Sequence, residues 1–239
     1  MSTTTPSPWR GPSGIAAPGR VLLPQSPFCP GRGGQLPDRG SIIWDGGESA
    51  ITRFELSEEG IWHVLADDKA EPCGTVEARV DSEFRRLMQE LHTATHILNA
   101  VIFVSFNRAL VTGAQMASDG TARMDFDLPD ADNDRLRAIE AALNDAIRQD
   151  LTVKDTYVAV VDAQREYGLI RNRSVAPPPT KDGKIRIVEI AGLDRQACGS
   201  THLRSTGLSP PIRILKIDNK GRHNRRVYIG LQGRSPILR

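Results

Sequence analysis

The spacing of hydrophobic residues changes near residue 80 of the chain. Before that point, short apolar segments such as SIIW (41–44), ITRFEL (51–56) and IWHVLA (61–66) are separated by stretches rich in Gly, Pro and Asp. Short strands with frequent turns are typical of small β-domains. We therefore expect a β-rich, barrel-like N-terminal domain over residues 21–80, preceded by a flexible leader at 1–20 that is rich in Ser, Thr, Pro and Gly.

Beyond residue 80 two segments have helical periodicity. Residues 81–104 carry apolar residues at helical spacing, with Asp81 or Ser82 as the N-cap. Residues 132–150 are amphipathic, with one apolar face formed by Leu136, Ile139, Leu143 and Ile147. Both segments predict helices.

Strand patterns surround these helices. We expect strands at 121–128, 152–163 and 184–190, and a hairpin in which 212–218 and 225–231 flank the turn NKGRHN. The sequence thus predicts an α+β fold, in which residues 81–239 form an α/β domain with an antiparallel sheet.

Composition narrows the class of protein. The chain has 239 residues, 25% of them charged and 39% hydrophobic, with a formal net charge of only +2, as expected for a soluble globular protein. The chain has only three cysteines, a small and odd number that does not indicate a disulfide framework. This scarcity favours a reducing compartment. No secretory signal pattern and no apolar run of about 18–20 residues is present. We expect a cytoplasmic protein with no membrane partner.

Two pairs of metal-binding residue types stand four residues apart. His92 and His96 share one face of the predicted helix, and Cys198 and His202 repeat the spacing about a hundred residues later. An isolated histidine pair would more often be two ordinary helix-face side chains. Three imidazoles and one thiolate, however, suit zinc. The long separation disfavours a zinc finger and favours a site between a helix and a loop.

The two motifs, HTATH and CGSTH, resemble the zinc motifs of the AlaX family of trans-editing proteins, which are free-standing relatives of the alanyl-tRNA synthetase editing domain. The flanking RLMQELHTATHIL is similar to the family's helix, and DRQACGSTH is similar to its D-x-x-x-C-G-G-T-H segment. PGRGGQLPDRG (30–40) resembles the glycine-rich motif of the medium-length members. The resemblance runs from about residue 21 to residue 231.

The resemblance implies that residues 81–239 are a zinc-dependent tRNA editing domain and that the substrate is a mischarged tRNA, Ser-tRNA(Ala) first and Gly-tRNA(Ala) second. It implies four zinc ligands: His92, His96, Cys198 and His202. Zinc can lower the pKa of a bound water to about 7 and polarise a carbonyl, or it can act mainly by orienting the substrate or water. The implied substrate contacts are Gly31, Arg32, Gly33, Gly34, Gln35, Thr95 and Thr201. The competing interpretations are a tight turn for the glycines and packing or outer-shell hydrogen bonds for the threonines.

The chain departs from the family pattern at several positions. Ser200 stands where the family has Gly, and Cys29, Gly31 and Arg32 replace Tyr, Thr and Gly in the glycine motif. Loss of the Thr hydroxyl and methyl at position 31 would enlarge an acyl pocket and remove a partner for a serine hydroxyl. The alternative substrate is therefore a threonine-type amino acid, such as a fluorothreonine or another threonine analogue, carried on tRNA(Thr).

The C-terminus is basic although the whole chain is nearly neutral. Its last 28 residues contain eight Lys or Arg and one acid, Asp218. A basic run is usually a solvated face, but a hairpin that concentrates positive charge can contact phosphates. We expect five residues of this region to bind tRNA: Lys216, Lys220, Arg222, Arg225 and Arg226.

Two other classes of function are compatible with these residues. One is a catalytically inactive, zinc-containing tRNA-binding module, and the other is a zinc hydrolase of small esters or amides. No motif places a Ser-His-Asp set, which makes covalent catalysis the less favoured mechanism. Monomer and dimer are both left open.

Overall fold

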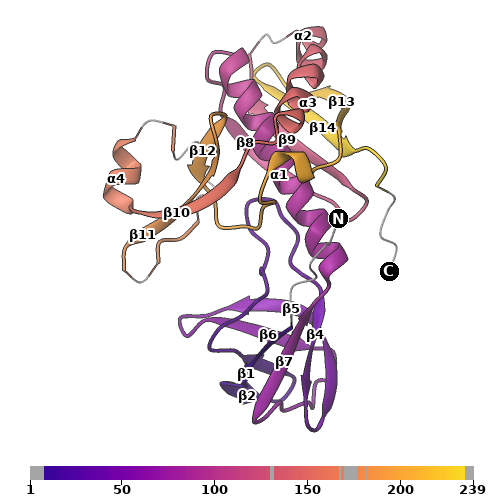
Figure 1. The fold of residues 1–239 in the computed structure, drawn as a ribbon, viewed down its shortest axis with the longest axis vertical. Helices are drawn as coiled ribbons and strands as arrows, with labels where there is room; N and C mark the ends of the chain where they lie inside the picture. Colours follow the sequence, from indigo (N-terminus) through magenta and orange to yellow (C-terminus); the bar gives the residue numbers. More distant parts are fainter. Residues whose placement is uncertain (1–7, 130–131, 167, 170–176, 181, 235–239) are drawn as a thin grey trace. The chain divides into compact units, whose positions relative to one another are not determined.

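The computed structural model describes residues 8–129, 132–166, 168–169, 177–180 and 182–234. The chain has an α+β fold with mostly antiparallel sheets, as the sequence predicts (Figure 1). It separates into two compact units. Unit 1 contains Met1–Gly31 and Leu36–Arg86, and unit 2 contains Arg32–Gln35 and Leu87–Arg239. A short part of the glycine-rich motif thus belongs to unit 2.

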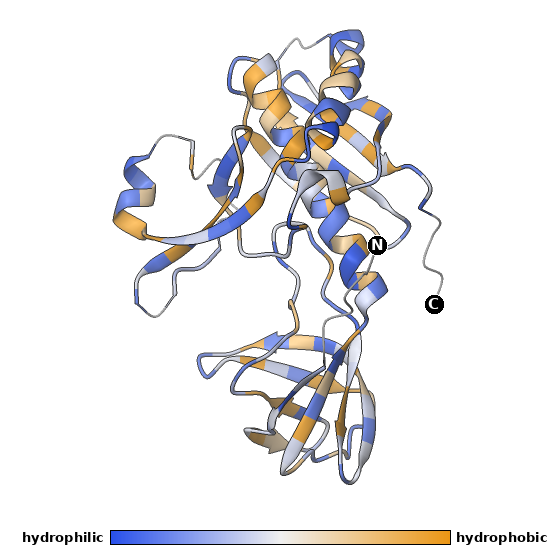
Figure 2. Ribbon diagram, viewed as in Figure 1, coloured by the Kyte–Doolittle hydropathy of each residue, from blue (hydrophilic) through white to orange (hydrophobic). Residues whose placement is uncertain are grey.

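Unit 1 is one antiparallel sheet that curls into half a barrel. Its seven strands have the order β1-β7-β4-β5-β6-β3-β2, so β1 and β2 are the two edges and the barrel stays open. The strands are β1 (Trp9–Pro12), β2 (Ile15–Ala17), β3 (Arg20–Leu22), β4 (Gly40–Trp44), β5 (Gly47–Leu56), β6 (Ile61–Leu65) and β7 (Thr75–Val80). Hydrophobic and hydrophilic residues alternate along them (Figure 2), and the apolar side chains form a core around Val21, Ile42 and Val76.

The first strands correct one prediction. Residues 1–7 lie outside the described residues, but much of 8–20, expected in a flexible leader, is ordered as β1, β2 and the start of β3. Trp9 pairs with Ala78 of β7, and Ile15 pairs with Leu22 of β3. β1 pairs with the distant strand β7, and the β2–β3 hairpin joins the sheet through the distant strand β6. This long-range pairing supplies backbone hydrogen bonds that local composition does not reveal.

The long helix α1 (Ser82–Ser105) agrees with the predicted 81–104 segment. Asp81 caps its start, because the Asp81 side chain accepts a hydrogen bond of 3.0 Å from the backbone N–H of Phe84. Residues 82–86 belong to unit 1 and residues 87–105 to unit 2. The predicted 132–150 helix is divided into α2 (Asn133–Ala138) and α3 (Glu140–Arg148) by a turn at Ile139.

The larger sheet of unit 2 is four-stranded, antiparallel and ordered β13-β14-β9-β8. Its strands are β8 (Val111–Met116), β9 (Thr121–Asp127), β13 (Ile212–Asn219) and β14 (Asn224–Leu231). The predicted hairpin is confirmed as β13 and β14. Apolar pairs such as Val227–Met124 are buried in the core, and the alternating pair Arg226–Asp125 is a partly buried ion pair. α3 is fixed to β13 through Asn144, which hydrogen-bonds both the N–H and the carbonyl of Ile212.

The second sheet of unit 2 positions the cysteine motif. It has three antiparallel strands in the order β10-β11-β12 (Figure 1): β10 (Val153–Ala159), β11 (Lys184–Ile190) and β12 (Asp194–Ala197). The strand predicted at 152–163 ends earlier, because Val160–Arg165 form a short helix, α4. A 3₁₀ turn, η1 (Thr206–Leu208), follows the loop after β12.

Within the described ranges, no helix combines the length and the apolar character that a membrane crossing requires.

Candidate metal centre

Unit 2 brings the two four-apart motifs together. His92 and His96 lie on consecutive turns of α1, and Cys198 and His202 lie in the loop after β12. One potential ligand atom from each of the four residues lies within 4.8 Å of the others. Cys198 Sγ is 3.6 Å from His92 Nε2 and 3.3 Å from His202 Nε2. His202 is half-buried, whereas the other three residues are buried.

The donor set fits a zinc ion. Tetrahedral zinc with Zn–N distances of about 2.0–2.1 Å and Zn–S of about 2.3 Å separates N and S ligands by about 3.6 Å. The two sulfur–nitrogen distances are close to that value. Three imidazoles and one thiolate also match zinc in softness and number.

Each imidazole is held from behind by a neighbouring side chain. The Nδ1 atoms contact oxygen atoms at 3.1–3.4 Å, which leaves the Nε2 atoms for the centre of the cluster. Such outer partners orient metal-binding histidines and set their tautomer. The pairs are His92 with Gln35, His96 with Asp194, and His202 with Thr93.

A buried polar network supports His96. Asp194 Oδ2 lies 3.2 Å from His96 Nδ1 and accepts a 2.7 Å hydrogen bond from Gln196, which in turn accepts one of 3.0 Å from Asn99 on α1. None of these three residues was predicted to belong to the site. A signal exists, because Asp194 and Gln196 alternate on β12 and share one face, while Asn99 stands three residues after His96 on the helix.

Charge within the cluster favours a thiolate. Burial raises the pKa of the Cys198 thiol, but electrostatic interactions and hydrogen bonds with the His92 and His202 imidazoles outweigh burial and hold this pKa well below its ordinary value. Burial lowers the pKa of His96, yet Asp194 and Cys198 raise it to about 9. Burial and the charges of His96 and His92 lower the pKa of His202 to about 3. The thiolate is the form that binds metals.

The glycine-rich segment Arg32–Gln35 packs against this cluster. Gly34 accepts a 2.8 Å hydrogen bond from the N–H of Met116, and a Cβ at Gly34 would lie 2.6 Å from the carbonyl oxygen of Ala114. Its φ of +85° also favours glycine. A Cβ placed on Gly33 would lie 3.5 Å from Cε1 of His92. The segment therefore passes directly beside a metal-site histidine.

Ser200, a departure from the family motif, joins the two loops. Its buried hydroxyl donates a 2.7 Å hydrogen bond to the carbonyl oxygen of Arg32. Glycine at this position could not form the bond. The cysteine loop and the glycine-rich segment are thus connected by the hydrogen bond from Ser200 to Arg32.

The other residues expected to contact substrate differ in their surroundings. Thr201 lies beside Gln35, with its hydroxyl 3.1 Å from Gln35 Oε1. Thr95 is buried, and its hydroxyl donates a 2.7 Å hydrogen bond to the carbonyl oxygen of His92 within α1. Gly31 belongs to unit 1 and is not grouped with the cluster. Their substrate contacts stay predictions.

Arg186 of β11 holds the cysteine loop in place and was not singled out from the sequence. Its guanidinium donates to the carbonyl oxygens of Cys198 at 3.1 Å and Ser200 at 2.7 Å, and to Asp155 of β10 at 3.2 Å. Arginine can hold several acceptors in a fixed arrangement. The sequence does not indicate that Arg186 holds this loop, because a basic residue in a strand is usually only a surface residue.

Comparison with known proteins gives a consistent result. The family described as "Threonyl and Alanyl tRNA synthetase second additional domain" matches residues 185–228. The protein named "Alanyl-tRNA editing protein AlaX-M" from Methanosarcina barkeri is 32% identical over 218 residues, which cover 88% of each chain. Its namesake from Methanosarcina acetivorans is also 32% identical, with 88% of each chain covered. The chain belongs to the AlaX family.

Longer relatives of this AlaX-family chain are alanine–tRNA ligases. The ligase of Korarchaeum cryptofilum is 35% identical over 199 residues, which are 82% of this chain but 22% of the ligase. The chain thus spans about a fifth of the length of the ligases it matches. The resemblance based on the two zinc-type motifs is confirmed at the level of the family.

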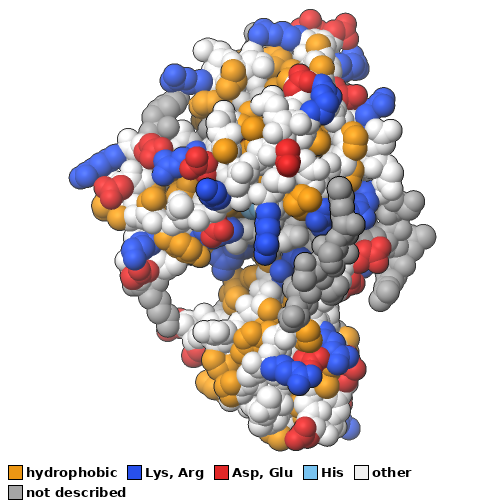
Figure 3. Space-filling model, viewed as in Figure 1, with side chains coloured by type: hydrophobic (Ala, Val, Ile, Leu, Met, Phe, Trp, Pro, Cys, Tyr) orange, Lys and Arg blue, Asp and Glu red, His pale blue; other side chains and the backbone are white. Residues whose placement is uncertain are grey.

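The basic β13–β14 hairpin of this AlaX-family chain contains arginines that are buried or ion-paired and other cations that are exposed. Arg225 is 8% exposed, and Arg226 donates two hydrogen bonds to Asp125, at 2.6 and 2.8 Å. Lys220 and Arg222 are exposed in the turn, and exposed Lys216 pairs with Asp218. Basic and acidic side chains are interspersed in Figure 3. The cations in and near the turn are therefore better placed for a partner than Arg225 or Arg226.

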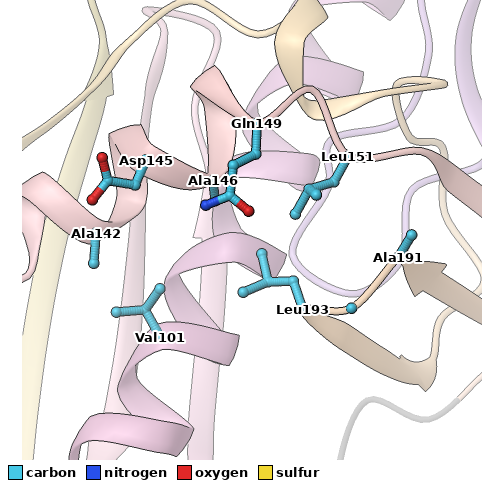
Figure 4. Close-up of a pocket in the computed structure, with 9 residues that line it drawn as sticks. Val101, Ala142, Asp145, Ala146, Gln149, Leu151, Ala191 and Leu193 are labelled. Carbon is cyan, nitrogen blue, oxygen red and sulfur yellow. The ribbon is translucent and has the colours of Figure 1, made fainter.

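A pocket of about 420 Å³ lies elsewhere in unit 2. Figure 4 shows Asp145 on α3, Gln149 directly after α3, Val101 on α1 and Leu193 on the turn before β12 around it. None of the four cluster residues lines this pocket. It is thus distinct from the candidate metal centre.

Proposed function

We propose that this chain hydrolyses the ester bond of a mischarged tRNA in trans, with Ser-tRNA(Ala) as its first substrate and Gly-tRNA(Ala) as its second. The observation that carries the proposal is the N₃S cluster packed beside the glycine-rich segment. Membership of the AlaX family supports it, because two relatives of similar length are named alanyl-tRNA editing proteins.

His92, His96, Cys198 and His202 would hold a zinc ion. When bound, zinc would supply positive charge that polarises the ester carbonyl and favours ionisation of water. The chain's own residues build the surroundings: Asp194, Gln35 and Thr93 orient the imidazoles, and Arg186 and Ser200 fix the loop that carries Cys198 and His202. The proposed editing domain is 81–239, with residues 21–80 as the β-rich domain that precedes it.

The reaction is ester hydrolysis. The oxygen of water bonds to the carbonyl carbon, the bond between that carbon and the ribose oxygen breaks, and the ribose oxygen takes a proton. The amino acid leaves as a carboxylate with release of the second proton. With tRNA as the substrate, we propose that the protein acts in the cytoplasm. The exposed cations Lys216, Lys220 and Arg222 would contact the phosphates of the tRNA.

The test is a panel of acylated tRNAs. Initial deacylation rates are measured in parallel on Ser-tRNA(Ala), Gly-tRNA(Ala), Ala-tRNA(Ala), Thr-tRNA(Thr) and a threonine-analogue tRNA(Thr). The proposal expects the highest kcat/KM for Ser-tRNA(Ala). Preference for a threonine-type tRNA, motivated by Gly31, would replace this substrate but keep the reaction. Tight tRNA binding without hydrolysis would instead favour an inactive binding module.

A further inference from the structure

The two ends of the Gln35 side chain have very different surroundings. Gln35 is 5% exposed. Its Oε1 lies 3.1 Å from His92 Nδ1, 3.1 Å from Thr201 Oγ1 and 3.2 Å from the backbone N of Thr201. Its Nε2 is also buried, but no hydrogen-bond acceptor from the described residues reaches it. Buried donors without partners are rare in folded proteins and call for an explanation.

The groups around Gln35 determine which atom of its amide is the oxygen and which is the nitrogen. The backbone N–H of Thr201 can only donate, so the Gln35 atom facing it must be the oxygen. His92 Nδ1 must then carry a proton and donate to that oxygen. A neutral imidazole has its lone pair on the other nitrogen, so Nε2 of His92 is available as a ligand atom on the side of Cys198.

The backbone that carries Gln35 is held on two sides. The N–H of Met116 donates to Gly34, and the hydroxyl of Ser200 donates to Arg32. The N–H of Gln35 itself donates to the carbonyl oxygen of Arg32 at 2.9 Å. Rotating the amide by half a turn would place an NH₂ group against the Thr201 N–H. The buried Nε2–H donor is therefore fixed in one orientation beside the candidate metal centre.

We propose that Gln35 acts through both ends: its oxygen positions His92, and its Nε2–H donates to the carbonyl oxygen of the bound aminoacyl ester. This inference rests on the proposed function. The carbonyl oxygen gains negative charge as water adds to the carbonyl carbon, and it returns to a double bond as the ribose oxygen leaves with a proton. A preoriented neutral N–H stabilises that charge without having to reorganise.

Two substitutions separate the two ends. Gln35→Glu keeps an oxygen for His92 and Thr201 but replaces the NH₂ donor with a second oxygen. Gln35→Leu removes both ends at similar size. Gln164→Glu, on an exposed position of α4, is the control for added charge. For each full-length protein, zinc affinity is measured by chelator competition, and kcat and KM are measured on Ser-tRNA(Ala) at saturating zinc.

Gln35→Glu should retain zinc affinity within about 3-fold while kcat falls by about 100-fold or more, with little change in KM, as when an oxyanion donor is lost. Gln35→Leu should weaken zinc affinity by about 10–100-fold, which is typical of removing an outer-shell partner. Far-UV circular dichroism and thermal melting of the metal-free proteins establish that each variant is folded.

A wild-type kcat for Gln35→Glu would overturn the donor role, and wild-type zinc affinity for Gln35→Leu would overturn the positioning role. A different result applies to the proposed function itself. If the unmodified protein hydrolyses no mischarged tRNA, that function is wrong. The zinc affinity of Gln35→Leu would then still decide whether Gln35 orients His92.

Discussion

Ser200 illustrates how one side chain can join two loops that are far apart in the sequence. Its hydroxyl donates to the backbone carbonyl oxygen of Arg32, an acceptor that any residue at position 32 would offer. Of these two residues, only Ser200 contributes its side chain to the bond. Neither spacing nor periodicity reveals this contact, because 168 residues separate the two partners.

Ser200→Gly, which restores the family residue, should destabilise the protein. Loss of a buried hydrogen bond costs about 1 kcal/mol, and added backbone freedom costs about 0.5–1 kcal/mol more. Ser200→Ala is the matched variant that removes only the hydroxyl. The free energies of unfolding come from urea denaturation. Equal stability of Ser200→Ala and the unmodified protein would show that the Arg32 contact contributes nothing.

His63 in unit 1 gives a pH-dependent prediction at the same scale. It is fully buried, with Nδ1 3.1 Å from the carbonyl oxygen of Val21 and Nε2 2.7 Å from the hydroxyl of Ser26. Burial, which outweighs the bond to Val21, lowers the pKa of His63 below its ordinary 6.5. The unfolded chain therefore binds more protons. The stabilisation is complete above about pH 6.5 and is lost as pH falls, by at most about 1.4 kcal/mol per pH unit.

His63→Phe should lower stability at pH 7.5 but make it less dependent on pH between 7.5 and 5. Urea unfolding at several pH values measures the difference from the unmodified protein, which cancels the titration of the other histidines. His223→Gln, at an exposed position, should leave the pH dependence unchanged. Identical pH dependence of His63→Phe and the unmodified chain would rule out this role for His63.

At the scale of elements, regular patterns predicted the structure well and irregular ones did not. The period of α1 and the alternation of β11, β13 and β14 are properties of one segment, so the sequence contains them. β1 depends on its distant partner β7, whereas β2 pairs with the neighbouring β3, and Pro and Gly in this stretch obscured both strands. The sequence does not indicate that β10 ends at Ala159, because the β-branched residues Val160 and Val161 continue the strand-like pattern into α4.

The β13–β14 hairpin leads to a prediction about salt. Lys220→Ala combined with Arg222→Ala should weaken tRNA binding and reduce the slope of log K against log salt by about 2, because each phosphate contact accounts for about one unit. Arg165→Ala, an exposed cation of α4 with an acidic neighbour, is the control. The measurement is tRNA affinity by filter binding across salt concentrations. A slope that does not change would make the turn an ordinary solvated surface.

At the scale of the whole molecule, the site combines segments that are far apart in sequence. The ligand types and their four-residue spacing identify the two halves of the cluster, because spacing on a helix or a tight loop is local information. The outer partners Asp194, Gln35 and Thr93 are set by packing between elements. Their hydrogen bonds became apparent only from the three-dimensional arrangement, although Asp194 stands in the motif that carries Cys198.

The most direct test of this account is hydrolysis of Ser-tRNA(Ala) by protein of known zinc content. The rate is measured on zinc-loaded protein, after removal of zinc by a chelator, and after zinc is restored, with His92→Ala and Cys198→Ser treated in the same way. We expect about one zinc per chain, loss of activity when zinc is removed, recovery when zinc is restored, and weakened zinc binding in both variants. Full hydrolytic activity in the zinc-free protein, or undiminished zinc binding in both variants, would contradict it.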